Sequence, residues 1–287
     1  MIEWQFEHFK TFTPYAIMQQ AAAALLLYEG ESTDGTNPQM GRLTEELTIN
    51  TGHSAWMPAR ENGNLDINTE GSVFRNKARL FSAFFICVPP DLLKTEGYGK
   101  QIMLTGFGKA LAKGQIKEAD FYRFIVQRFQ FPHIAYSDYD EWVKSGVVIR
   151  PLVVILKSLV ELFEQKGFSE AYITASEVCK WLQPLEDENV ISAVSSIWDG
   201  RKTSAQYNYS SDQLRKISEM LAFLAIAGYV YIDSTGNIDK YRLNLIARHP
   251  KEKTMFFLQR TAGGAGTGTS KTKVNVIDEY KRIWEES

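Results

Sequence analysis

Polar side chains that can hydrogen-bond to the edges of nucleic-acid bases gather at the start of one predicted helix, residues 72–88. The first turns of this helix carry Ser72, Arg75, Asn76 and Arg79. An Arg guanidinium can donate two hydrogen bonds to guanine O6 and N7, and an Asn amide can pair with adenine N6 and N7. A helix that reads the major groove uses residues near its N-terminus. These residues are candidates for base recognition, and the alternative is an ordinary solvated helix face.

A second group of the same residue types precedes and opens the helix predicted for residues 211–227. Its candidates for base contacts are Arg201, Gln206, Asn208 and Arg215. Arg60 and Asn62 belong to a long loop, residues 50–69, and loops of this length in compact domains are often functional. The N-terminal residues form a candidate arm, with Trp4, Gln5, His8 and Lys10. The alternative for the arm is a segment packed on the first domain.

Basic residues cluster in two stretches, although the net charge of the chain is only −2. Residues 75–113 carry seven Lys and Arg against two acidic residues, and residues 240–253 carry five against one. Local basic stripes on a nearly neutral protein are typical of a nucleic-acid surface, and the alternative is again a solvated face. The candidates for phosphate contacts are Lys77, Lys100, Lys109, Lys202, Lys216, Lys240, Arg242 and Lys251.

Residue patterns for catalysis or metal binding are scarce. The four histidines are scattered along the chain: His8, His53, His133 and His249. None has a Cys or carboxylate partner at ligand spacing. A Gly-x-Ser-x-Gly elbow is absent, and residues 263–271 depart from the phosphate-loop order because Thr269 stands where that motif needs lysine. We therefore predict no catalytic residue, no metal ion and no cofactor in this chain.

The clearest secondary-structure pattern is a helix followed at once by a hairpin. Apolar residues recur at helical spacing from Leu214 to Leu224, and Gly228 can end the helix. Strands are predicted for residues 229–233 and 238–244. Alternating side chains in the second strand place one face against the protein and the other in solvent. This order is the closing half of a winged helix.

The same order is predicted earlier in the chain, where the helix of residues 72–88 stops at Pro89-Pro90 and strands 91–95 and 100–105 can pair. Further helices are predicted at residues 15–28, 43–49, 116–129, 151–166, 174–182 and 189–198. The expected fold is mainly α with small β-hairpins (α+β), with two winged-helix subdomains joined by a mainly helical bridging subdomain. The expected boundaries are 1–112 for the arm and first winged helix, 113–150 for the bridge, 151–260 for the second winged helix and 261–287 for a linker and further helix.

Composition fits a globular protein of two modest domains. The apolar share is 44%, and no apolar run is long enough to cross a bilayer. No secretory signal opens the chain, and the two cysteines, Cys87 and Cys179, are expected to be reduced core residues of a cytoplasmic protein. The Gly-rich residues 261–270 read as a linker, and residues 274–286 begin a helix with no predicted packing partner. We expect a further domain beyond residue 287.

Three motifs resemble the recognition domains of modular restriction endonucleases of the FokI, AlwI and BpuJI kind. They are residues 104–111 (Leu-Thr-Gly-Phe-Gly-Lys-Ala-Leu), 130–132 (Gln-Phe-Pro) and 149–156 (Ile-Arg-Pro-Leu-Val-Val-Ile-Leu). The resemblance covers about residues 1–260 and is strongest to the N-terminal domain of BpuJI. It implies two winged helices, specific binding of a short DNA site, and a nuclease domain elsewhere that would use Mg²⁺.

Taken together, these features predict a non-catalytic chain that reads a short asymmetric site in double-stranded DNA through the major groove. We expect the domain to bind DNA as a monomer in the bacterial cytoplasm, with any dimerisation through a C-terminal domain. One alternative is a replication initiator or transcription regulator with two winged helices and no nuclease. Another is a winged-helix module that binds protein, in which case the basic stripes would be incidental.

Overall fold

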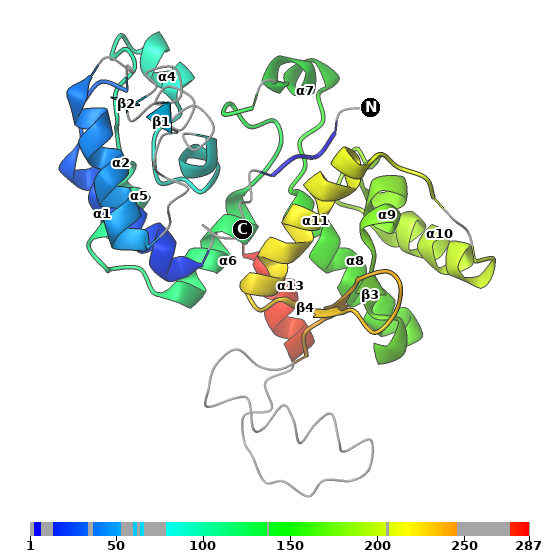
Figure 1. The fold of residues 1–287 in the computed structure, drawn as a ribbon. Helices are drawn as coiled ribbons and strands as arrows, with labels where there is room; N and C mark the ends of the chain where they lie inside the picture. The colour runs from blue at the N-terminus through cyan, green and yellow to red at the C-terminus, as the bar shows by residue number, and fades with distance from the viewer. Residues whose placement is uncertain are drawn as a thin grey trace, which may run out of the picture.

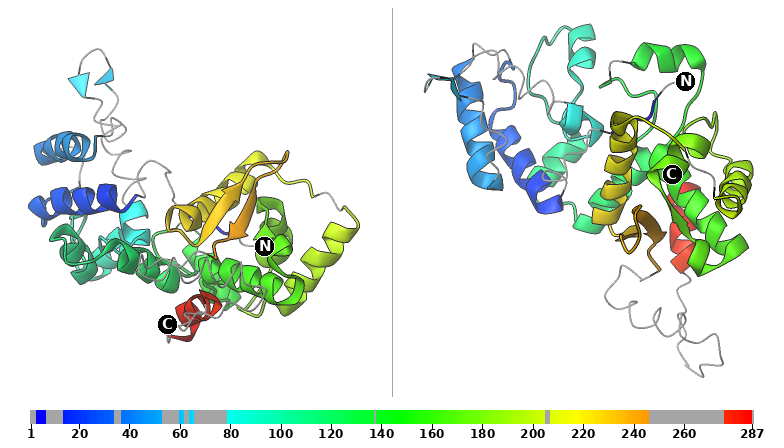
Figure 2. Two further views of the ribbon diagram at one scale, coloured as in Figure 1. Left: turned by 90° about the horizontal axis from the view of Figure 1, so that it is seen from below. Right: turned by 45° about the vertical axis from the view of Figure 1, so that its right-hand side comes forward.

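The computed structural model describes residues 3–6, 14–33, 37–52, 60–61, 64–65, 79–136, 138–204, 207–245 and 276–286. These residues form two lobes, with the helix α6 (Glu118–Arg128) between them (Figure 1). Figure 2 shows the two lobes from below and with the right-hand side of Figure 1 turned forward. Most of the described structure is helical, and its strands make two small antiparallel sheets, as expected of a mainly α protein with small β elements.

Short helices build the N-terminal lobe. Its elements are α1 (Tyr15–Leu27), α2 (Pro38–Thr51), β1 (Arg60–Glu61), β2 (Asn64–Leu65), α4 (Pro90–Thr95) and α5 (Gly106–Ala112). Helix α1 packs against both α2 and α5. Helix α2 begins earlier than the predicted Leu43, because Pro38 fits a first helical turn and the Asn37 side chain accepts a hydrogen bond from the backbone N–H of Gln39 at 3.0 Å.

The hairpin predicted for residues 91–105 is wrong. Residues 90–95 form α4 instead, because Pro90 suits the first helical turn and Asp91 places a carboxylate near the helix N-terminus. The helix before it ends at Ala83 and not at the predicted Val88. Two isolated bridges replace the hairpin: Ser32 with Gln101 and Cys87 with Leu104. Residues 79–136 therefore contain no hairpin of the predicted kind.

The motif at residues 104–111 holds a tight turn of the backbone. Phe85 has a φ of 58°, a left-handed conformation that is costly for a bulky residue. The Thr105 hydroxyl donates to the carbonyl oxygen of Phe85 and accepts from the backbone N–H of Gly108 at 2.9 Å, so it also caps α5. A Cβ on Gly108 would lie 2.1 Å from the carbonyl oxygen of Ile86, so only glycine fits there.

The connector between the lobes, residues 130–146, contains a short helix, in keeping with the mainly helical bridge that the sequence predicted. This helix, α7 (Tyr139–Ser145), ends at Gly146, whose φ of 70° is the usual left-handed stop. Phe131 and Ile149 exchange backbone hydrogen bonds of 2.8 and 2.9 Å, which close the connector into a loop. The ring of Phe131 also stacks on Trp142 of α7 with centroids 5.0 Å apart. The connector is therefore an ordered, packed element.

The C-terminal lobe follows the predicted order closely. Its elements are α8 (Pro151–Lys166), the 3-10 turn Phe168–Glu170, β3 (Tyr172–Ile173), α9 (Ala175–Glu177), the π-helical turn Val178–Leu182, α10 (Ile191–Lys202), α11 (Ser211–Ile226), β4 (Val230–Asp233) and β5 (Lys240–Leu243). Helix α8 has the predicted bounds. A capping box joins Thr174 to Glu177 at the start of α9, and a second box joins Ser210 to Gln213 at the start of α11. Helix α10 continues through Gly200, beyond the predicted Trp198.

The β4–β5 hairpin is confirmed, and a third strand joins it. Strand β5 lies in the middle, in the order β3-β5-β4, with all pairs antiparallel. Tyr241, Leu243 and Leu245 are buried, while Lys240 and Arg242 are partly exposed, as the alternation predicted. The two-residue strand β3 carries too short a pattern to be recognised in the sequence.

The two lobes share one hydrophobic core. Residues 3–6 lie on the side of the C-terminal lobe, whereas α1, which follows soon after in the sequence, belongs to the N-terminal lobe (Figure 1). Phe6 is fully buried, and its ring lies 5.5, 4.8 and 5.1 Å from Phe84, Phe129 and Phe223. These three rings come from the N-terminal lobe, the end of α6 and α11. Phe6 therefore packs where all three parts meet.

The C-terminal helix α13 (Val276–Glu285) packs on α6 and α8, so the expectation that it has no packing partner is wrong. Its buried residues are Ile277, Tyr280 and Ile283. The Tyr280 hydroxyl bonds to the carbonyl oxygens of Tyr229 and Asn244, both at 2.6 Å. These bonds join α13 to the β4–β5 hairpin, which lies about 40 residues earlier in the chain.

Candidate nucleic-acid interface

Several predicted contact residues lie outside the described residues, and their roles stay predictions. They are His8, Lys10, Asn62, Ser72, Arg75, Asn76, Lys77, Gln206 and Lys251. Arg60 lies in β1, but its side chain is not described. Arg79 is the first described residue of its helix and is partly exposed.

Arg201 is engaged inside the protein, which corrects its prediction as a base-reading residue. Its guanidinium donates to Glu177 Oε1 at 2.7 Å and to the carbonyl oxygens of Glu170 and Tyr172 at 3.0 and 2.6 Å. The same group lies 3.7 Å from the centre of the Tyr172 ring, and the side chain is only 11% exposed. These partners occupy its donors. They belong to segments two dozen or more residues earlier, so local sequence context could not reveal them.

Tyr172 gathers further cations beside the β4–β5 hairpin, and sequence reasoning missed it. Lys240 Nζ and the Arg242 guanidinium lie 4.7 and 4.9 Å from the ring centre. Burial raises the pKa of the Tyr172 hydroxyl, so the ring stays neutral. Only the pairing of β3 with β5 brings this ring to the cations, so no spacing in the sequence signals it.

The two cations of β5 differ in how they are used. Arg242 donates to Asp233 Oδ2 at 2.6 Å and to the carbonyl oxygen of Ser169 at 2.9 Å. Hydrogen bonds from Thr235 and Arg242 lower the pKa of Asp233 to about 2, so this carboxylate stays charged. Among the described residues Lys240 has no carboxylate partner within ion-pair distance. The Lys240 ammonium is therefore the better placed of the two to meet an external anion.

The start of α11 is charged and exposed. Arg215 pairs with Asp212 at 2.8 Å and with Glu219 at 2.5 Å, and its side chain is 57% exposed. Lys216 pairs with Glu3 at 2.8 Å and with Asp212 at 3.1 Å. Ion pairs at a solvated surface contribute only about 0–1 kcal/mol, so a phosphate can compete for such cations. Arg215 and Lys216 stay candidates.

The other described candidates vary in their partners. Lys109 pairs with Glu29 at 2.8 Å, and Lys202 pairs with Asp199 at 3.0 Å. Lys100 is exposed, as is Asn208 in the segment before α11, and the described part of the chain offers Lys100 no ion pair. Exposed cations in both lobes therefore remain available to an anionic partner.

Residues 3–6 are packed against the protein and do not form a free arm, but they lie beside the C-terminal lobe and not on the first domain as the alternative had it. Trp4 is fully buried and cannot contact a ligand, which corrects its prediction as an arm residue. The Gln5 amide donates to Asp138 Oδ1 at 3.1 Å, which ties the segment to the start of α7. Glu3 is held by Lys216 of α11. This segment is a structural tie between the lobes.

Within the described ranges, no three His, Cys, Asp or Glu side chains gather as a metal site would require. The described helices also include none with the length and apolar character needed to cross a membrane.

The chain matches a protein-family model described as "Restriction endonuclease BpuJI - N terminal" over residues 98–284. This match spans more than half of the chain. The chain belongs to this family. No curated protein matches the chain. One similar solved structure is described as "Crystal structure of pyrene- and phenanthrene-modified DNA in complex with the BpuJ1 endonuclease binding domain", at 13% identity and a TM-score of 0.48, covering 86% of this chain and 84% of that one.

The BpuJI N-terminal family match begins just before α5 and ends within α13, so it includes the connector, the C-terminal lobe and the C-terminal helix. The motif at residues 149–156 has a structural role within it. Arg150 donates two hydrogen bonds to Glu188, of 2.6 and 2.8 Å, and Lys157 adds a third of 2.8 Å. Burial alone would raise the pKa of Glu188, but these bonds lower it.

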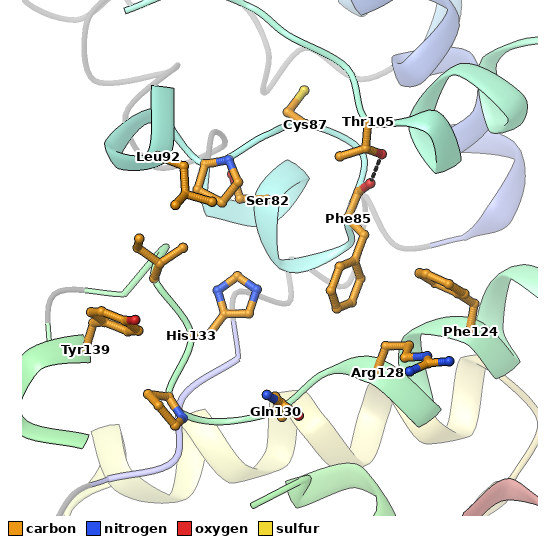
Figure 3. Close-up of a pocket in the computed structure, with 13 residues that line it drawn as sticks. Ser82, Phe85, Cys87, Leu92, Thr105, Phe124, Arg128, Gln130, His133 and Tyr139 are labelled. Atoms are coloured by element: carbon orange, nitrogen blue, oxygen red, sulfur yellow. Dashed lines mark hydrogen bonds between the residues drawn. The ribbon is translucent and has the colours of Figure 1, made fainter. Parts of the chain in front are cut away.

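A cavity of about 550 Å³ lies between the N-terminal lobe and the connector (Figure 3). Phe85, Phe124, His133 and Tyr139 bring rings to its lining. The backbone N–H of Ala135 donates to His133 Nδ1 at 3.2 Å, and burial lowers the pKa of His133 to about 4. His133 is therefore neutral at physiological pH, with its proton on Nε2.

This burial predicts a pH dependence of stability. An unfolded histidine has a pKa of about 6.5, so below that value the unfolded chain binds a proton that folded His133 rejects. The folded state therefore has its full stability above about pH 6.5, and it loses stability as the pH falls towards about 4, the pKa of folded His133. Between pH 7 and 4.5 the free energy of unfolding should fall by about 2 kcal/mol more in the wild type than in His133→Gln. Urea denaturation across this range measures the difference, and parallel pH profiles of the two proteins would contradict it.

Proposed function

We propose that this chain is the DNA-recognition part of a restriction endonuclease and binds a short asymmetric site in double-stranded DNA. The observation that carries the proposal is membership of the BpuJI N-terminal family across residues 98–284. The chain itself contributes no catalytic residue and no cofactor in this proposal. Cleavage, with its Mg²⁺, belongs to a catalytic domain of the parent protein.

The order of elements in the C-terminal lobe supports a winged-helix DNA-binding subdomain. Its helices α8, α9 and α11 alternate with β3 and the β4–β5 hairpin, and the early strand β3 joins the hairpin to make one sheet. Helix α11 is the favoured recognition helix over α10, because α11 leads directly into the hairpin. Its first turn would enter the major groove, where Arg215 and the preceding Asn208 can reach base edges.

The N-terminal lobe would supply a second set of contacts, although the described part of it has no wing. Its proposed base-reading residues are Arg60, Asn62, Ser72, Arg75, Asn76 and Arg79. Lys100 and Lys240 lie in different lobes, have no ion pair with any described residue, and would contact phosphates. We place the protein in the bacterial cytoplasm as a monomer on DNA, with dimerisation through the catalytic domain.

Salt dependence tests whether phosphates are bound. Each phosphate contact should contribute about −0.9 to the slope of log K against log salt concentration. Lys240→Ala should reduce the magnitude of that slope by about one and weaken binding to specific and random duplexes to the same extent. Binding constants from fluorescence anisotropy at about 50 to about 300 mM KCl, a roughly sixfold range of salt concentration, measure the slope. Lys281→Ala is the matched control, because the ammonium of Lys281, on α13, forms an ion pair of 2.6 Å with Glu164 of α8. A slope near zero for the wild type would favour a protein-binding module.

A further inference from the structure

The cavity between the N-terminal lobe and the connector has a buried polar group with no hydrogen-bond partner among the described residues. Ser82 is 2% exposed, lines the cavity, and its hydroxyl makes no hydrogen bond to any described residue. Burying a hydroxyl without a partner is costly, and such groups mark sites that a ligand or water completes. The cavity therefore has an unmet hydrogen-bonding position deep in its wall.

Aromatic faces surround this position. The Phe85 ring lies edge-on to Phe124 and His133, at 5.4 and 6.1 Å between centroids, and Tyr139 faces the same space (Figure 3). Phe85 has a left-handed conformation, and its carbonyl oxygen accepts a hydrogen bond from the Thr105 hydroxyl. Backbone strain of this kind is maintained at binding sites, where it fixes the direction of a side chain.

Polar groups at the open side complement these rings. Arg128 and Gln130 are exposed and line the cavity, and neither side chain has a hydrogen-bond partner among the described residues. The neutral His133 ring offers an Nε2–H donor, since its Nδ1 already accepts from Ala135. The site thus combines flat apolar walls, several hydrogen-bonding groups and one exposed cation.

We propose that this cavity receives a single nucleobase turned out of the DNA stack. A nucleobase is a planar ring with edge donors and acceptors, and it is joined to a phosphate that an exposed arginine can contact. The ring would lie against Phe85, its edge would meet Ser82 and Gln130, and Arg128 would contact the neighbouring phosphate. Enzymes that extrude a base hold it by stacking and by hydrogen bonds to its edge. The cavity volume of about 550 Å³ accommodates one base.

This proposal rests on the proposed DNA-binding function, and its test separates the two. A base turns out of the duplex at least cost when it is already unpaired. Duplexes of the selected site are therefore made with an abasic position opposite each base in turn. The wild type should bind one of these duplexes about tenfold more tightly than the intact site, because pairing no longer opposes extrusion.

Variants assign the effect to the cavity. Ser82→Ala and Gln130→Ala should each lose most of this tenfold gain while keeping the affinity of the intact duplex within about threefold. Ser82→Ala should also keep the thermal midpoint, because the removed hydroxyl has no partner to lose. The control is Ser195→Ala, an exposed α10 serine whose hydroxyl bonds to the Ile191 carbonyl, and it should keep the gain.

Four outcomes would overturn the proposal. If specific binding occurs but no abasic duplex binds more tightly, the cavity has no such role and the proposed function survives. If the gain persists in both cavity variants, the base is accommodated elsewhere. If millimolar deoxynucleoside monophosphates raise the thermal midpoint through Ser82 while abasic duplexes show no gain, the cavity takes free nucleotides. Absence of any specific DNA binding removes both proposals together.

Discussion

Replacing Phe6 with alanine should lower the free energy of unfolding by about 3–5 kcal/mol, the cost of deleting a fully buried aromatic ring. Phe6 is only 2% exposed and contacts Phe84, Phe129 and Phe223, which belong to three different parts of the chain. Because these parts share one core, the loss should affect both lobes. Urea denaturation followed by far-UV circular dichroism measures it.

Tyr98→Ala is the control for the Phe6 variant. Tyr98 is 51% exposed, so its removal should change the free energy of unfolding by less than about 0.5 kcal/mol. A Phe6→Ala protein that loses less than about 1 kcal/mol would mean that residues 3–6 are not part of the core. Those residues would then be available again as a DNA-contacting arm.

Arg201→Ala should be nearly as damaging, at about 3–5 kcal/mol, because it leaves the carboxylate of Glu177 buried with its main cationic partner removed. Glu177 is 7% exposed and receives a hydrogen bond of 2.7 Å from Arg201. The protein that remains folded should show the base preferences of the wild type, since Arg201 lies inside the lobe. Urea denaturation and a binding selection on the same preparation separate the two effects.

Arg215→Ala makes the matched comparison. Arg215 is also an arginine with two carboxylate partners, but it is 57% exposed, and its loss should cost only about 0–1 kcal/mol. If Arg215 reads a base, its variant should instead relax the preference at one position by about 1–3 kcal/mol. The reverse pattern, with specificity lost in Arg201→Ala and stability lost in Arg215→Ala, would contradict the assignment of both residues.

The C-terminal lobe was largely predictable because its signals are local. Helix α8 begins at a proline and ends just before a glycine. Helix α11 begins with a capping box and is followed by a hairpin whose second strand alternates buried and partly exposed side chains. These features act within a few residues, so the sequence alone displays them. The family resemblance of three motifs was likewise confirmed by the match over residues 98–284.

The N-terminal lobe was less predictable because its structure depends on distant contacts. Residues 91–95 could form a strand or a helix, and Pro90 decides for the helix at its first turn. The α13 helix looked unpartnered because the surface that it covers, on α6 and α8, is formed by residues more than 100 positions earlier. Local patterns cannot show such packing.

The candidate site divides in the same way. Residue type identified basic and amide side chains, but it could not say which of them the fold uses internally. Arg201 is bonded inside the protein and Trp4 is buried. Lys240 and Lys100 have no ion pair with any described residue. Tyr172 was missed because its role arises only when a two-residue strand joins β5. Burial and pairing are properties of the folded chain.

Selection from a library of randomised duplexes tests the central claim most directly. The purified chain is mixed with duplexes that carry about 14 random base pairs, roughly one and a third turns of the duplex, and bound DNA is sequenced over several rounds. We predict that one short asymmetric site is enriched and is bound at least about a thousandfold more tightly than random DNA at physiological salt. Binding without enrichment of any sequence, or no binding at all, would contradict the claim that this chain recognises a specific DNA site.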